Sequence, residues 1–92
     1  MIYEVRFTSR FKKDIKLVQK QGKNIDRLFD VVDTLARGEA LALKYRDHEL
    51  GGDYKGCREC HIEPDWLLLY IKDCDSLMLT LTRTGSHSDL FH

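Results

Sequence analysis

Three histidines, His48, His61 and His87, lie near the ends of predicted elements, together with Asp65 and Arg83. Histidine titrates near neutral pH, so it can act as a general acid or base without a large pKa shift. Arginine presents a planar fork of donors that can hold a phosphate during an in-line displacement. Taken singly, each histidine could simply be solvated at the surface, and the arginine could simply form an ion pair. Their shared position around turns indicates a common site for acid–base chemistry at a phosphate.

The first half of the chain predicts one strand followed by two helices. Residues 1–7 alternate between two faces, which is typical of a strand. Thr8 or Ser9 can cap a helix that ends at Gly22, and its core stripe is Phe11, Ile15 and Val18. A second helix begins after Asn24 and ends before Gly38. Its apolar positions follow the helical period and are predicted to be core: Ile25, Leu28, Phe29, Val32, Leu35 and Ala36.

The second half predicts three strands after a connector over 39–53, and the order of elements is therefore βααβββ. The strands are expected at 54–62, 66–71 and 77–84. Gly56 is expected at a bulge or close contact, and the continuous apolar run 66–71 should form a central strand buried on both faces. We therefore expect a single domain over 1–92: a two-layer α+β fold with a mainly antiparallel sheet and both helices packed on one side.

The composition favours a small cytoplasmic protein. The 92 residues are 42% hydrophobic and 33% charged, which is typical of one globular domain. The longest apolar run, 66–71, is too short to span a membrane, and the first residues do not resemble an export signal. Net charge is zero, but residues 1–23 carry seven bases against two acids, a balance of +5. Their lysines can contact phosphates of RNA, although a solvated helix face explains them equally well.

Three motifs together resemble one family of proteins. The first runs from Tyr45 to Leu50 as YRDHEL, the second from His61 to Trp66 as HIEPDW, and the third from Arg83 to Phe91 as RTGSHSDLF. In this spacing they are similar to the YafQ branch of the RelE-type bacterial toxins, and the resemblance covers nearly the whole chain. It implies the same βααβββ order and a ribosome-dependent endoribonuclease that cuts messenger RNA in the ribosomal A site, an mRNA interferase.

The resemblance also implies the site residues. Carried over onto this sequence, the active site of the family falls on His48, His61, Asp65, Arg83, His87 and Phe91. We expect His87 to donate a proton to the leaving 5′-oxygen and Arg83 to bind the scissile phosphate. Either His48 or His61 would take the 2′-hydroxyl proton with help from Asp65, and the sequence does not rank the two. No metal or cofactor is required for this chemistry.

Other residues are expected to contact RNA or to belong to the core. Phe91 would stack on an exposed base, as aromatic side chains do in single-strand RNA recognition. Trp66 begins a buried strand, and we expect it to be core. The expected ribosomal RNA contacts are Lys12, Lys13, Lys16 and Lys20.

The resemblance further implies partners. These are the ribosome, its mRNA and a cognate antitoxin of the ribbon-helix-helix type. Operator DNA would be contacted only through that antitoxin, which would either cover apolar grooves around the helices or displace the C-terminal segment. The alternative function is a non-catalytic module on the same fold that acts with its antitoxin in transcriptional repression. The complete set of histidines, aspartate and arginine favours the enzyme.

Cys57-Arg58-Glu59-Cys60-His61 matches the C-x-x-C-H pattern of haem attachment and requires an explanation. In a strand, positions three apart point to opposite faces, so both cysteines would not reach one haem. A single C-x-x-C with Cys74 is also a weak zinc signal. We therefore expect reduced cysteines, at least one of them buried, in place of a haem, zinc or disulfide site.

Overall fold

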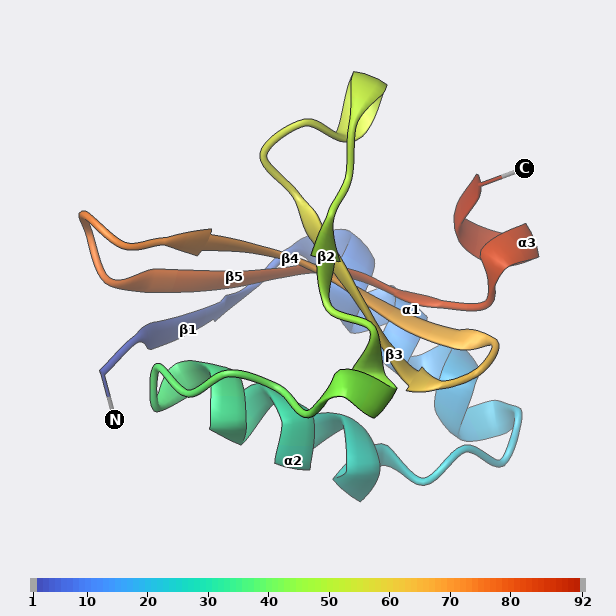
Figure 1. Ribbon diagram of the computed structural model, residues 1–92. Helices are drawn as coiled ribbons and strands as arrows, with labels where there is room; N and C mark the ends of the chain where they lie inside the picture. Colours follow the sequence, from blue (N-terminus) through green and yellow to red (C-terminus); the bar gives the residue numbers. More distant parts are fainter. Residues whose placement is uncertain (1, 92) are drawn as a thin grey trace.

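A computed structural model describes residues 2–91 and shows an α+β fold built on one five-stranded sheet (Figure 1). The strand order is β1-β5-β4-β3-β2; β1 pairs parallel with β5, and the other neighbours pair antiparallel. The strands are β1 (Glu4–Phe7), β2 (His48–Glu49), β3 (Arg58–Glu63), β4 (Trp66–Asp73) and β5 (Met78–Gly85). The helices are α1 (Ser9–Lys20), α2 (Ile25–Ala36) and α3 (His87–Phe91), with 3-10 turns η1 (Leu43–Tyr45) and η2 (Gly52–Tyr54).

The first two helices begin where their caps predict. The Thr8 hydroxyl accepts a hydrogen bond from the Phe11 amide at 3.0 Å, and the Asn24 side chain accepts one from the Asp26 amide at 3.0 Å. Each cap satisfies an N–H that has no partner inside the helix. The two-layer arrangement predicted from the sequence is confirmed by these helices and the sheet they cover (Figure 1).

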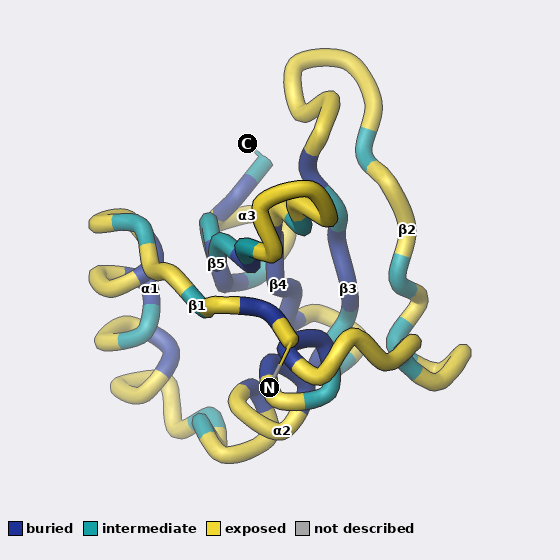
Figure 2. Tube along the Cα trace, turned by 90° about the vertical axis from the view of Figure 1, so that its left-hand side faces the viewer, coloured by how far each residue is buried: buried dark blue, intermediate teal, exposed yellow. Residues whose placement is uncertain are grey.

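The sheet has a different apolar cluster on each face. The larger cluster joins α1 and α2 to one face, and it contains Phe11, Leu28, Trp66 and Tyr70 among its buried members. The smaller cluster on the opposite face consists of Cys57, Leu67, Leu69 and Leu90, with Leu50 and Phe91 packed against it. Figure 2 shows the consequence, since β4 is largely dark blue, and β3 and β5 on either side of it combine dark blue with teal. The prediction that 66–71 is central and buried is confirmed for residues 66–70, whereas Ile71 is exposed.

Two helix and strand assignments depart from the prediction. Phe29 was expected in the core, but it is 40% exposed, and Val31 is buried in its place. Phe29 instead lines an open apolar groove with Phe7, Phe11 and Ile15, because α1 and α2 do not close over it. The first strand begins at Glu4, and Met1 lies outside the described residues.

The predicted connector and C-terminus contain more structure than the sequence indicates. The connector holds the two turns and the two-residue strand β2, which extends the sheet beside β3. The strand expected from residue 54 begins at Arg58, because Gly56 adopts φ +91° in the preceding turn. No atom would meet a Cβ at Gly56, so the left-handed backbone is what favours glycine there. After β5 the chain forms the short helix α3, whereas the sequence predicted only the end of a strand there.

The far end of β5 is covered by α1. β1 pairs with β5 only as far as Leu81, and beyond that point the edge of β5 would be unpaired. The Thr8 hydroxyl donates to the Thr82 carbonyl at 2.7 Å, and the Asp14 carboxylate accepts from the Thr84 amide at 3.2 Å. The start of α1 therefore takes over the hydrogen bonds of this edge and brings an acidic side chain to it. Over residues 2–91, none of the helices has both the length and the apolar character needed to cross a membrane.

Candidate active site

Four aromatic rings form a continuous row across one end of the sheet. The ring centroids of His48 and His61 are 6.5 Å apart, those of His61 and His87 are 6.0 Å apart, and those of His87 and Phe91 are 5.9 Å apart. Tyr54 continues the row with an edge contact to Phe91 at 5.1 Å. The row therefore brings together residues from β2, β3, α3 and the η2 turn that are up to 43 positions apart (His48 to Phe91). Tyr54 was not among the predicted site residues.

A buried carboxylate, Glu59, lies beside two of these rings. The residue is 4% exposed, and its Oε1 is 3.5 Å from His48 Nε2 and 3.3 Å from His61 Nε2. It shares a face of β3 with His61, since residues two apart on a strand point the same way. The sequence analysis did not identify Glu59. A charged residue inside the predicted strand 54–62 could have indicated it.

The other nitrogen of each ring faces a backbone carbonyl. His48 Nδ1 is 2.6 Å from the Arg46 carbonyl oxygen, and His61 Nδ1 is 3.2 Å from that of Pro64. A carbonyl only accepts, so both Nδ1 atoms carry hydrogen and donate. The Nε2 of each neutral ring then carries no hydrogen and is the atom that can take a proton, next to the Glu59 carboxylate. This pairing fits a general base.

His87 has a separate carboxylate partner, Asp65. Asp65 Oδ1 accepts a hydrogen bond from the His87 backbone amide at 3.1 Å and lies 3.4 Å from His87 Nδ1. The amide hydrogen bond lowers the pKa of Asp65, with further help from the His87 side chain, so the carboxylate stays charged below its usual range. Asp65 was expected to assist His48 or His61. Its contacts are with His87, because the β3–β4 turn reaches the first residue of α3.

Arg83 is held by Asp14 of α1. The Arg83 Nε donates to Asp14 Oδ2 at 2.7 Å, and one terminal nitrogen donates to Oδ1 at 3.2 Å. This hydrogen-bonded pair raises the pKa of Arg83 against the opposing effect of partial burial, with smaller contributions from Tyr54 and Asp89. The Arg83 side chain is 21% exposed. Its other terminal nitrogen has no hydrogen-bond partner in residues 2–91 and can hold an anion.

The four lysines expected to contact ribosomal RNA lie apart from the histidine row, and that contact stays a prediction. Lys12, Lys13, Lys16 and Lys20 are all exposed on α1. Lys12 and Lys16 line the apolar groove beside Phe29, and no histidine lines that groove. The three histidines, Asp65 and Phe91 do come together in space, whereas the side-chain contacts of Arg83 are with Asp14.

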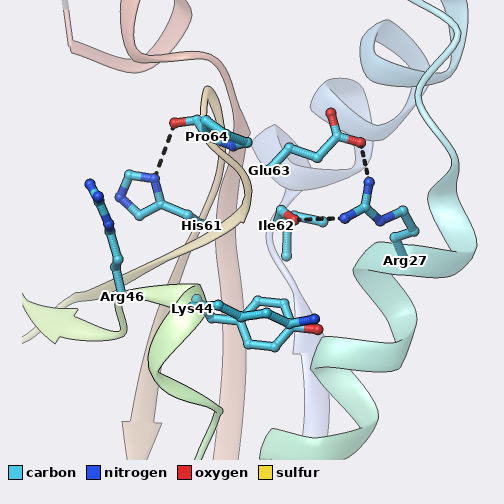
Figure 3. A pocket seen from close by; sticks show the side chains of 8 residues that line it. Arg27, Lys44, Arg46, His61, Ile62, Glu63 and Pro64 are labelled. Atoms are coloured by element: carbon cyan, nitrogen blue, oxygen red, sulfur yellow. Dashed lines mark hydrogen bonds and ion pairs between the residues drawn. The ribbon is translucent and has the colours of Figure 1, made fainter.

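A pocket of about 320 Å³ opens beside His61 (Figure 3). It is lined by Arg27, Lys44, Tyr45, Arg46, His61, Ile62, Glu63 and Pro64. In this pocket Arg27 donates to Glu63 at 2.7 Å and to the Ile62 carbonyl at 3.4 Å. None of its cations was among the predicted site residues, although Arg46 lies within the YRDHEL motif.

Trp66 and the cysteines lie where the sequence places them. Trp66 is fully buried, and its ring N–H donates to the Thr84 hydroxyl at 2.9 Å, so its assignment to the core is confirmed. Cys57 and Cys60 are buried in the two different clusters on opposite faces of the sheet, and Cys74 is exposed. Burial raises the pKa of Cys60 to about 12, which keeps that thiol protonated and unreactive at neutral pH.

The comparisons with known proteins identify the family. Residues 3–92 match the model of the "Bacterial toxin of type II toxin-antitoxin system, YafQ" family. The chain is 39% identical to the mRNA interferase toxin YafQ of Escherichia coli K12 over 89 residues, which cover 96% of this chain and 95% of the relative. The chain therefore belongs to the YafQ toxin family, as its motifs indicate.

Solved structures of relatives share the fold. The E. coli DinJ–YafQ complex contains a chain that superposes with a TM-score of 0.90 at 35% identity, over 98% of this chain and 99% of that one. A metal-bound toxin from Helicobacter pylori superposes with a TM-score of 0.90 at 43% identity, over 99% and 100% of the two chains. Within residues 2–91 of the present chain, no group of three or more histidine, cysteine, aspartate or glutamate side chains is arranged to hold a metal.

Proposed function

We propose that this protein is an mRNA interferase, a toxin that cuts messenger RNA on the ribosome. The observation that carries the proposal is the row of three histidines with two separate carboxylates, Glu59 beside His48 and His61, and Asp65 beside His87. Two histidines held by separate partners can serve as base and acid in one reaction. The relatives named mRNA interferases support the same activity.

The proposed reaction begins at the 2′-hydroxyl of the RNA. His48 or His61 takes its proton at Nε2, and Glu59 stabilises the resulting imidazolium. The 2′-oxygen then attacks the adjacent phosphorus, forming a 2′,3′-cyclic phosphate as the bond to the 5′-oxygen breaks. Arg83 binds the negatively charged phosphate through its free terminal nitrogen, and such donors are most effective where charge develops.

The leaving 5′-oxygen receives its proton from His87. The Asp65 carboxylate contacts His87 at Nδ1, which leaves Nε2 to deliver the proton. Phe91, in contact with the His87 ring, would stack on a base next to the scissile bond. All these steps use side chains of this protein, so we propose that the cleavage does not require a metal ion.

The proposed partners are the ribosome, its mRNA and a cognate antitoxin, and the place of action is the cytoplasm. The DinJ–YafQ structures support an antitoxin partner, because they contain a relative bound to DinJ. We propose a ribbon-helix-helix antitoxin that alone contacts operator DNA. The apolar groove of Phe7, Phe11, Ile15 and Phe29 and the segment 87–91 are the two surfaces on which it would act.

Primer extension on a defined mRNA tests the proposal. Purified, antitoxin-free protein is added to ribosomes programmed with this mRNA and, separately, to the naked mRNA. We expect cuts at A-site codons in the ribosome sample and at least tenfold less cutting of naked RNA, since the ribosome positions the strand. Equal cutting in both samples would remove the ribosome from the proposal. Folded protein that cuts neither sample would leave the non-catalytic module as the function.

A further inference from the structure

The pocket beside His61 has more positively charged side chains than carboxylates to neutralise them (Figure 3). Its three cations are Arg27, Lys44 and Arg46, and its one carboxylate, Glu63, is ion-paired with Arg27. Lys44 lies over the Tyr45 ring with its nitrogen 5.2 Å from the centroid. Within residues 2–91, neither Lys44 nor Arg46 has a carboxylate partner. Three cations and one carboxylate leave the pocket with two positive charges, which suits an anionic ligand.

The backbone at Arg46 indicates that this residue has a particular use. Its φ of 50° and ψ of 41° place it in the left-handed region, which is unfavourable for a non-glycine residue. This conformation ends the η1 turn and directs the Arg46 carbonyl to His48 Nδ1. Strain of this kind is found at functional sites, where the surrounding structure holds it in place. The same residue thus orients a histidine of the site and contributes a cation to the pocket.

We propose a phosphate subsite in which Arg46, beside His61, binds a phosphate of the RNA backbone next to the scissile bond, and Lys44, on the opposite side of the pocket, adds positive charge along the same strand (Figure 3). His61 lines this pocket and also stands in the ring row, so a strand whose scissile phosphate lies at the row passes directly into the pocket. Arginine holds phosphate oxygens through two parallel hydrogen bonds, and lysine adds a point charge. This inference rests on the proposed function, because it names a further contact for the same substrate.

The test uses Arg46→Asn, because asparagine tolerates the left-handed backbone and the substitution removes the guanidinium charge. Arg6→Gln is the matched control. It also removes one exposed positive charge, but on the edge strand β1 at the other side of the sheet. Cleavage of ribosome-bound mRNA should show a KM about tenfold higher in Arg46→Asn, with kcat within about twofold of the wild type. Arg6→Gln should change neither value. An unchanged KM in Arg46→Asn would overturn the subsite.

A modified mRNA identifies the phosphate that is bound. A methylphosphonate, which has no charge, replaces in turn the phosphate on either side of the cut. At one of the two positions the methylphosphonate should raise the KM of the wild type about tenfold. The same substitution should have no further effect on Arg46→Asn, because that variant has already lost the contact. Effects that multiply at both positions would instead assign Arg46 to ribosomal RNA and overturn the mRNA subsite.

A binding measurement separates failure of the subsite from failure of the proposed function. Fluorescence anisotropy of a labelled single-stranded RNA reports binding whether or not the protein cuts. Arg46→Asn should weaken this binding about tenfold and reduce the slope of log affinity against log salt by about 0.7. Equal binding by Arg46→Asn and wild type would overturn the subsite, even if the wild type cuts mRNA as proposed.

Discussion

Replacing His87 with alanine should lower the cleavage rate on ribosome-bound mRNA by about 10²- to 10⁴-fold, the usual contribution of a general acid. The reason is that the 5′-oxygen is a poor leaving group until it is protonated. The His87 side chain is 55% exposed, so the variant should keep its fold and its melting temperature. Single-turnover cleavage of a defined mRNA, with a thermal melt of the same sample, measures both quantities.

A substrate with a better leaving group shows whether His87 is the acid. In an mRNA with sulfur in place of the 5′-bridging oxygen at the cut, the departing thiolate needs no proton. His87→Ala should cut this substrate within about tenfold of the wild-type rate, whereas Arg83→Ala should remain slow on it. If His87→Ala were equally impaired on both substrates, the residue would have another role, such as contacting the RNA.

Loss of Arg83 should reduce cleavage by about 10²- to 10³-fold, and Asp14 should matter because it positions this arginine. Asp14→Asn removes the charge that holds the guanidinium by two hydrogen bonds. We expect cleavage to fall about tenfold to 10²-fold, since a small displacement of a binding group is costly. The variant should also lose about 2 kcal/mol of stability to urea. This is less than for a fully buried pair, because Arg83 keeps some solvent exposure.

A double-mutant cycle separates positioning from a general loss of structure. If Asp14 acts through Arg83, then Arg83→Ala together with Asp14→Asn should cut as fast as Arg83→Ala alone. Rates are compared at a temperature where every variant is folded. The double variant could instead be slower than Arg83→Ala by the full factor that Asp14→Asn causes alone. In that case Asp14 would affect cleavage through its contact with the Thr84 amide and not through Arg83.

The helices were predictable because their signals are local. Thr8 and Asn24 cap the helices that follow them, and a cap depends only on residues a few positions away. The exposure of Phe29 was not predictable in this way. The helical period places it on the apolar face of α2, and whether a neighbouring helix closes over that face is decided by packing that involves α1. The strand β2 was not predictable either, because two residues are too few to show an alternating pattern. It forms through its pairing with β3.

The site residues were predictable as types, but their partners were not. The motifs point to the three histidines, whereas the carboxylates that contact each of them depend on strand register. Glu59 lies opposite His48 across two strands and two positions before His61, and only the fold brings both rings to it. Asp14 gave a clearer signal, because it falls on the stripe of Phe11 and Val18, where a charge requires a partner.

If the histidine row promotes attack by the 2′-hydroxyl, cleavage requires that hydroxyl on the nucleotide before the cut, and one altered nucleotide removes it. An mRNA is made with a single 2′-deoxynucleotide immediately 5′ of the scissile phosphate and is presented on the ribosome. We predict no cleavage at that bond, normal cleavage at a second, unmodified site, and a 2′,3′-cyclic phosphate at the unmodified cut. Cleavage at the deoxynucleotide at the normal rate would contradict the account, because the reaction would then use water or another nucleophile.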